Sequence, residues 1–313
     1  MIKNRTHELI TQIRDHVNRR EKQVQLLSEH EKWLKLTSSL DVLADTACAI
    51  EYYLASSYPD ELGAKYLYTY GLLQCIMLMQ DAANGISSTL LGENIQWEKE
   101  HPQSYQVRMI RNDVAGHPTN RKDSTYIYLA QSSLSKDHFV YMKSPSTIEQ
   151  QPDFLNVDVE EVVSETFECI NGILKGTVDQ LDTELRLYKD EHKQRKMANI
   201  FSTLGYASEK VLLRDVVFMA GGYRDTKRMI SECEQELIKR FGSVETIEAF
   251  AWKIAEIKNV YGLIEGEIDK LSSDFRKKVE DCLHQYLFDR LEELKSLCEE
   301  VDGDFEAELE PGF

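Results

Sequence analysis

Long stretches in which apolar residues recur every three or four positions constrain the fold of this chain most strongly. Within 61–91 they include Leu62, Tyr66, Leu73 and Met77, a spacing that gathers side chains on one face of an α-helix. Similar spacing predicts helices over 5–36, 39–56, 61–91, 102–116, 157–195, 207–220, 224–241, 243–271 and 273–299. The pair Gly221-Gly222 is interpreted as the break between two of them. Short connections favour antiparallel neighbours, with 61–91 as the central helix.

Two short β-rich runs interrupt the helical pattern. Residues 126–129 and 138–142 are rich in tyrosine, valine and isoleucine and flank a polar connection, which predicts a hairpin. The expected fold is therefore all-α: an antiparallel helical bundle with a small β-hairpin inserted near 126–142, followed by a second set of long helices. We expect a domain over 1–195, a C-terminal helical region over 196–301 and a solvated acidic tail over 302–313.

Charge is unevenly distributed along the chain. The net charge is −17, and most of the acidity lies in residues 161–313, with 21 basic and 33 acidic residues. A protein that binds nucleic acid nonspecifically normally carries a basic surface. Residues 101–148, by contrast, hold more basic than acidic side chains. Any polyanion is therefore expected to bind locally, near this stretch.

Several common classes of protein do not fit the sequence. The first residues run directly into charged helical sequence without the apolar core of an export signal, and no apolar run reaches membrane-spanning length. These features predict a cytoplasmic protein without membrane contact. Neither the histidines nor the cysteines show metal-ligand spacing, so no metal or cofactor is expected. The cysteines are interpreted as reduced, mostly buried thiols: Cys48, Cys75, Cys169, Cys233, Cys282 and Cys298.

One segment combines residue types that could carry chemistry. Arg111 and Asn112 lie near the end of a predicted helix and His117 follows after four further residues. We expect Gly116 to take a left-handed conformation that ends the helix and lets His117 turn back toward Arg111. A histidine that moves protons and a guanidinium that holds a phosphate suit metal-free RNA cleavage by the RNA's own 2′-hydroxyl. The alternative is a surface arginine with a histidine that caps the last carbonyl groups of its helix.

The segment resembles the signature of the HEPN superfamily, an arginine and a histidine separated by four to six residues of which the first is usually Asn, Asp or His. The resemblance extends over about 60–180, through Tyr68–Gln74, Gln80-Asp81-Ala82 and the hairpin that follows the motif. It implies a helical bundle that forms a homodimer with two facing motifs, as in many RNA-cleaving toxins and defence effectors. It also implies that Arg111 and His117 are catalytic and that Asn112 orients them. Residues beyond about 180 resemble no family.

Other polar residues are weaker candidates. Gln74, Gln80, Asp81 and Asn84 lie near one side of the predicted helix 61–91. They could line a cleft opposite Arg111 or satisfy one another in a packed interface.

Three basic residues could contact the substrate. Arg108 could bind phosphate or form a salt bridge with Asp113 or another carboxylate. Arg121 and Lys122 follow the motif, where they could guide RNA or remain solvated.

Two functional hypotheses follow. The first is a metal-independent HEPN-type endoribonuclease, a toxin or antiphage effector that acts as a homodimer on RNA, with an antitoxin or regulatory protein as a partner. The second is a non-catalytic helical module that binds a nucleotide or another protein. The acidity of the chain favours the second, and the motif favours the first.

Overall fold

The computed structural model describes residues 2–19, 22–23, 26–27, 29–116, 118–119, 125–147, 150–213, 215–245, 247–266 and 273–306. Contacts between Cα atoms divide the described residues into two compact units. The first consists of residues up to 18 together with Leu26–Leu181, and the second of residues within 19–25 together with those from 182 onward. Each unit has its own buried hydrophobic core.

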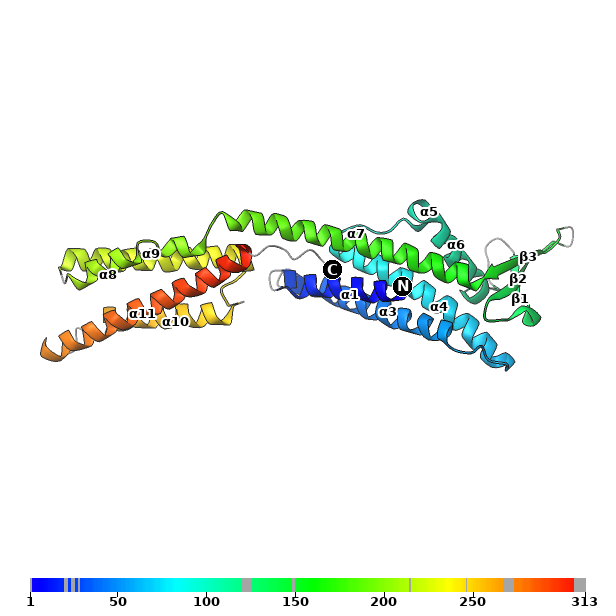
Figure 1. Ribbon diagram of the computed structural model, residues 1–313, viewed down its shortest axis with the longest axis horizontal. Helices are drawn as coiled ribbons and strands as arrows, with labels where there is room; N and C mark the ends of the chain where they lie inside the picture. Colours follow the sequence, from blue (N-terminus) through cyan, green and yellow to red (C-terminus); the bar gives the residue numbers. More distant parts are fainter. Residues whose placement is uncertain are drawn as a thin grey trace. The chain divides into compact units, whose positions relative to one another are not determined.

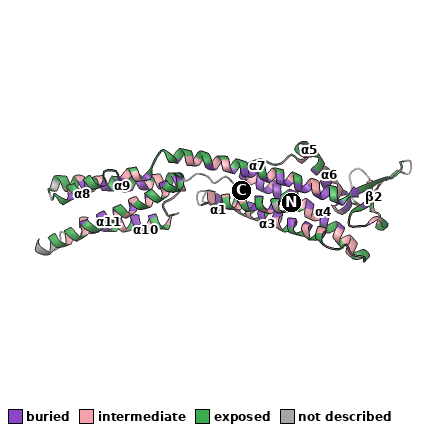
Figure 2. Cartoon of the chain, viewed as in Figure 1, coloured by how far each residue is buried: buried purple, intermediate pink, exposed green. Residues whose placement is uncertain are grey.

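The first unit is a helical bundle (Figure 1). Its helices are α1 (Ile2–Asn18), α3 (His30–Ala55), α4 (Leu62–Leu90), α5 (Trp97–Glu100), α6 (Pro102–Arg111) and the first part of α7 (Val159–Lys193). The helices turn apolar faces toward one another, and these faces are buried in Figure 2. Leu43 of α3, Ile76 of α4 and Ile170 of α7 are among the buried residues of this core. The antiparallel bundle predicted from the apolar spacing is confirmed.

The single helix predicted over 5–36 is wrong. Helix α1 ends at Asn18, and α3 begins at His30 after Glu29, whose φ of −112° and ψ of 73° are not helical. Leu27 and Leu34, two apolar residues of this stretch, are 47% and 53% exposed. The interruption changes the helical phase, so that Leu36 and Leu40 lie in the core.

A small antiparallel sheet follows the α6 segment. Strands β1 (Thr125–Leu129), β2 (His138–Pro145) and β3 (Asp153–Asp158) lie in the order β1-β2-β3, with a 3₁₀ turn, η2 (Gln131–Ser133), between the first two. The predicted hairpin is confirmed, with Tyr128 opposite Met142. The third strand was not predicted, because only Val157 of its residues is buried and the strand lacks apolar alternation.

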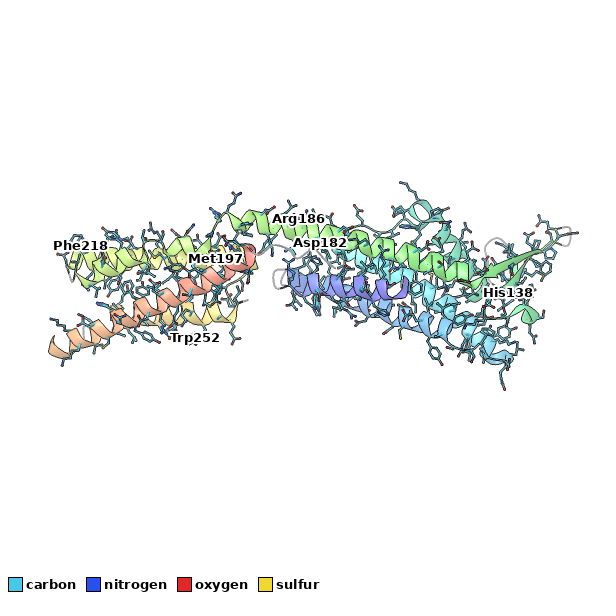
Figure 3. All side chains as sticks on the ribbon, viewed as in Figure 1. His138, Asp182, Arg186, Met197, Phe218 and Trp252 are labelled. Atoms are coloured by element: carbon cyan, nitrogen blue, oxygen red, sulfur yellow. The ribbon has the colours of Figure 1, made fainter. Side chains whose placement is uncertain are left out.

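The second unit contains the end of α7, a 3₁₀ turn η3 (Met197–Phe201), and the helices α8 (Leu204–Leu212), α9 (Val216–Phe241), α10 (Glu248–Gly266) and α11 (Ser273–Glu306). Its core includes Met197, which is fully buried and labelled in Figure 3. The predicted second set of long helices is confirmed. No helix in the described part of the chain is both long enough and apolar enough to cross a membrane.

Gly221-Gly222 does not break a helix, as the sequence suggested, but lies inside α9. The break comes earlier, where the Asp215 carboxylate caps α9 by accepting hydrogen bonds from the amides of Val217 and Phe218. A Cβ atom on Gly222 would lie 2.7 Å from the carbonyl oxygen of Ala207 and from Cγ2 of Val211, both on α8. The glycine therefore permits α8 and α9 to pack closely.

The acidic segment 302–306 is also different from the prediction. It belongs to α11 rather than to a solvated tail, and residues 307–313 lie outside the described residues. Asp302 is only 7% exposed, and its carboxylate accepts hydrogen bonds from the amides of Met197 and Ala198 at 2.8 and 2.9 Å. Asp302 can be buried because its carboxylate is hydrogen-bonded at the start of η3. The pattern of apolar residues in the sequence does not reveal such a contact.

Candidate active site

The candidate site lies where α6 ends. Pro102 occupies the first turn of α6, where its missing N–H costs nothing. After Arg111 the helix widens into a π-helical turn, η1 (Asn112–Gly116), in which Asp113 and Val114 are buried. π-helical turns are rare in proteins, and those that do occur often lie at functional sites. The burial of Val114 fixes this turn to the core and leaves Arg111 partly exposed at its start.

Arg111 is held by neutral amide groups. Its Nε and Nη2 donate hydrogen bonds to Oε1 of Gln74, on α4, at 3.2 and 2.8 Å. Its Nη1 donates to Oδ1 of Asn112 at 3.1 Å. Within the described ranges, no carboxylate accepts a hydrogen bond from this guanidinium or lies within 4.0 Å of it. The arginine is therefore positioned without losing its positive charge to a neighbour.

Arg108, one turn earlier on α6, has a different environment. Its Nη2 donates to Oδ1 of Asp81 at 2.9 Å, and its Nη1 donates to Oε1 of Gln80 at 3.2 Å. The guanidinium also lies 5.5 Å from the ring centre of Trp97, and only 17% of the side chain is exposed. Of the two alternatives considered for Arg108, the structure gives the salt bridge, with Asp81 rather than Asp113 as the partner.

The four polar residues of α4 have separate roles. Gln74 binds Arg111, and Asp81 pairs with Arg108. Gln80 is fully buried, and its Nε2 also donates to the carbonyl oxygen of Ser104 at 3.0 Å. Asn84 accepts a hydrogen bond from the amide of Ile95 at 2.8 Å and so holds the segment that leads to α5. Three of these residues therefore contact the arginines of α6, whereas Asn84 binds the segment between α4 and α5.

Gly116 does not take the left-handed conformation that the sequence suggested. Of the glycines in the described ranges, only Gly92 and Gly242 have a positive φ. A Cβ atom on Gly116 would lie 3.0 Å from Nη1 of Arg111 and 3.5 Å from Oδ1 of Asn112. A side chain at position 116 would crowd the guanidinium of Arg111, and this crowding, rather than the backbone conformation, accounts for the glycine.

Asp113 is a buried acidic residue that the sequence did not single out as part of the site. Its Oδ2 lies 3.5 Å from the hydroxyl of Tyr141, which donates to it, and 3.9 Å from Nζ of Lys143. Both partners are on β2, so Asp113 ties the π-helical turn to the sheet. The sequence could indicate Asp113 only through its position within the motif, because its burial and its contacts with Tyr141 and Lys143 depend on the fold.

The remaining predicted site residues cannot be placed. His117, Arg121 and Lys122 lie outside the described residues, so the meeting of Arg111 and His117 stays a prediction. Among the residues that the structure describes, no group of three His, Cys, Asp or Glu side chains is arranged to hold a metal ion.

Comparison with known proteins adds no assignment. No protein-family model matches the chain, and no curated protein or solved structure matches it significantly. The described part of the site contains a partly exposed arginine, Arg111, whose guanidinium is fixed by neutral amide oxygens.

Proposed function

We propose that this protein is a metal-independent endoribonuclease of the HEPN type, in which Arg111, Asn112 and His117 act together on RNA. The observation that carries the proposal is Arg111, a partly exposed residue whose guanidinium is held by the amide oxygens of Gln74 and Asn112. Neutral acceptors fix the geometry of an arginine while leaving its charge for a ligand. A phosphodiester, like a carboxylate, presents two oxygens that match the donors of a guanidinium.

In the proposed reaction the RNA supplies the nucleophile. The 2′-oxygen attacks the adjacent phosphorus and the bond to the 5′-oxygen breaks, which leaves a 2′,3′-cyclic phosphate and a 5′-hydroxyl. His117 accepts the proton of the 2′-hydroxyl, and the departing 5′-oxygen takes a proton from water or from His117 of the second copy. Arg111 stabilises the charge that develops on the phosphoryl oxygens. Asn112 holds Nη1 of Arg111, which keeps the guanidinium in register with the phosphate.

The resemblance also leads us to propose a homodimer, in which two such sites face each other, and a role as a toxin or antiphage effector. An antitoxin or regulatory protein and a cytoplasmic location belong to the same proposal. Light scattering on the purified chain measures the dimer, and a strict monomer would exclude a site shared by two copies.

The decisive experiment compares Arg111→Ala and His117→Ala with the wild type on a mixed-sequence RNA in the presence of a metal chelator. We expect the wild type to leave 2′,3′-cyclic phosphate ends and each variant to lose about 100-fold or more in rate, as for other removed transition-state donors. Arg108→Ala is the matched control, because it removes the same group three residues away where Asp81 already compensates it. Cleavage that survives both changes would exclude the nuclease and leave the non-catalytic helical module.

A further inference from the structure

A stacked pair of tyrosines lies on the exposed face of α4, close to the residue that anchors Arg111. The rings of Tyr66 and Tyr70 have centres 5.9 Å apart and planes inclined by 28°. Tyr70 is 38% exposed, so part of its ring remains accessible. Gln74 follows Tyr70 by one helical turn, which places both side chains on the same face of the helix.

The direction of α6 brings the motif toward these rings. Arg108 of α6 contacts Gln80 of α4, whereas Arg111 contacts Gln74. Residue numbers therefore rise along α6 as they fall along α4, and the chain after Arg111 continues toward the end of α4 that carries Tyr70. The π-helical turn η1 also packs against α4.

Gly71 leaves open space beside Tyr70. A Cβ atom on Gly71 would meet no atom within 4 Å, and its φ is not positive. Neither packing nor backbone conformation thus requires a glycine here, although a glycine inside a helix costs about 1 kcal/mol relative to alanine. The open space leaves room for a ligand to approach the backbone of α4 between Tyr70 and Gln74.

We propose that the ring of Tyr70, backed by Tyr66 and bordered by Gly71, stacks on an unpaired RNA base next to the phosphate bound by Arg111. The inference rests on the proposed nuclease function and narrows its substrate to single-stranded RNA or loops. Bases in a duplex are already stacked on both faces, whereas unpaired bases are free to stack on aromatic side chains. A tyrosine hydroxyl is neutral near pH 7, and partial burial together with Tyr66 raises the pKa of Tyr70 further above its ordinary value.

The test measures binding and cleavage separately in the full-length chain. A short, fluorescein-labelled single-stranded RNA with 2′-O-methyl groups at every position cannot be cleaved, and its anisotropy reports binding. We expect Tyr70→Leu to raise the Kd for this RNA about tenfold, and to raise KM more than it lowers kcat on cleavable RNA. Tyr70→Phe, which keeps the ring, should stay within about twofold of wild type. Gly71→Met should weaken binding by filling the open space, without lowering the melting temperature.

Leu67→Ala is the matched control, because Leu67 is 74% exposed on the same helix and offers no ring. Unchanged binding by Tyr70→Leu, with cleavage still dependent on Arg111 and His117, would overturn the stacking proposal and leave the nuclease intact. A wild type that binds this RNA through Tyr70 but cuts nothing would overturn the nuclease alone. A dimer that becomes a monomer in Tyr70→Leu would show that a second copy covers the ring, which also overturns the stacking proposal.

Discussion

Two anchored arginines, one in each unit, show how the surroundings of a guanidinium decide its use. Arg240, near the end of α9, has a fully buried side chain. Its Nε donates to Oε1 of Glu236 at 3.0 Å, and its Nη1 lies 3.5 Å from Oδ1 of Asp302. The ring of Phe305 covers the guanidinium at 5.0 Å. Arg111 instead is partly exposed and held by amides.

The difference is one of charge rather than of rigidity. Both guanidinium groups are fixed by several hydrogen bonds, but two carboxylates compensate Arg240 inside the protein, where an unpaired charge would be costly. Only neutral oxygens surround Arg111 in the described structure, so its charge is available to an anion from solution. Arg240 is thus explained by the stability of its unit, whereas the binding role of Arg111 is the one that we propose. Each of the following changes should affect one of these properties without the other.

Arg240→Ala should have the largest effect on stability. It would leave the carboxylates of Glu236 and Asp302 without their buried cation, and we expect a loss of about 3–5 kcal/mol in the free energy of unfolding. Urea unfolding followed by circular dichroism measures it. Lys239→Ala is the control, because Lys239 is 43% exposed and pairs with exposed Glu191, a type of pair that contributes about 1 kcal/mol or less. Equal losses in the two variants would contradict a structural role for Arg240.

Gln74→Glu should give Arg111 the surroundings of Arg108. The geometry of the hydrogen bonds can remain, but a carboxylate would now compensate the guanidinium and repel a phosphate. We expect RNA cleavage to fall about 10- to 100-fold, which corresponds to about 1.4–2.8 kcal/mol in the barrier. The melting temperature should not fall. Asp81→Asn makes the reverse change beside Arg108 and should leave cleavage within about threefold. A fully active Gln74→Glu variant would show that the uncompensated charge is unimportant.

The long helices and the hairpin could be predicted because their apolar residues recur with a regular period. Helix α4 was predicted at 61–91 and runs over Leu62–Leu90. The sequence-based predictions were wrong where contacts with distant residues, rather than a regular apolar pattern, determine the local structure. Strand β3 is held mainly by its pairing with β2 and buries little. Gly222 lies within helix α9, where its missing side chain makes room for α8.

For the site, spacing singled out Arg111 and Asn112, and it allowed Gln74 to be a candidate opposite Arg111. It could not distinguish the salt bridge of Arg108 from a phosphate contact, because the partner Asp81 lies 27 positions away in sequence. The role of Gly116 was also misjudged, because the sequence cannot show that a guanidinium occupies the space beside its Cα atom.

Gly116→Ala tests that space directly. The new methyl group would lie 3.0 Å from Nη1 of Arg111, so the guanidinium must shift. We expect cleavage to fall about tenfold, because small displacements of a positioned group are costly in catalysis. Gly172→Ala is the matched control, since a Cβ atom there meets nothing within 4 Å. Its cleavage should be unchanged and its stability equal or higher. The prediction fails if Gly116→Ala cleaves RNA at the wild-type rate.

The smallest effect concerns the pH dependence of the buried Arg240 region. His192 is 3% exposed, and its Nδ1 lies 3.8 Å from Oε1 of Glu236. Burial, and then the charges of Arg240 and Lys239, lower the pKa of His192 below 6.5 despite Glu191 and Glu236. As the pH falls below 6.5, His192 becomes protonated in the unfolded chain but stays neutral in the folded chain. The free energy of unfolding should therefore decrease until the pH reaches the lowered pKa of the folded state.

Each unit by which the pKa is lowered corresponds to about 1.4 kcal/mol of that loss. His192→Gln should therefore flatten the change in melting temperature between about pH 7 and 5.5, a range that brackets the ordinary pKa of histidine. His138→Gln, which replaces an exposed histidine on β2 (Figure 3), should leave the wild-type slope unchanged. If the slope persists in His192→Gln, other groups cause it, and the cations around His192 do not destabilise its protonated form. A flattened slope would show that burial and the neighbouring cations disfavour the protonated form of His192 inside the fold.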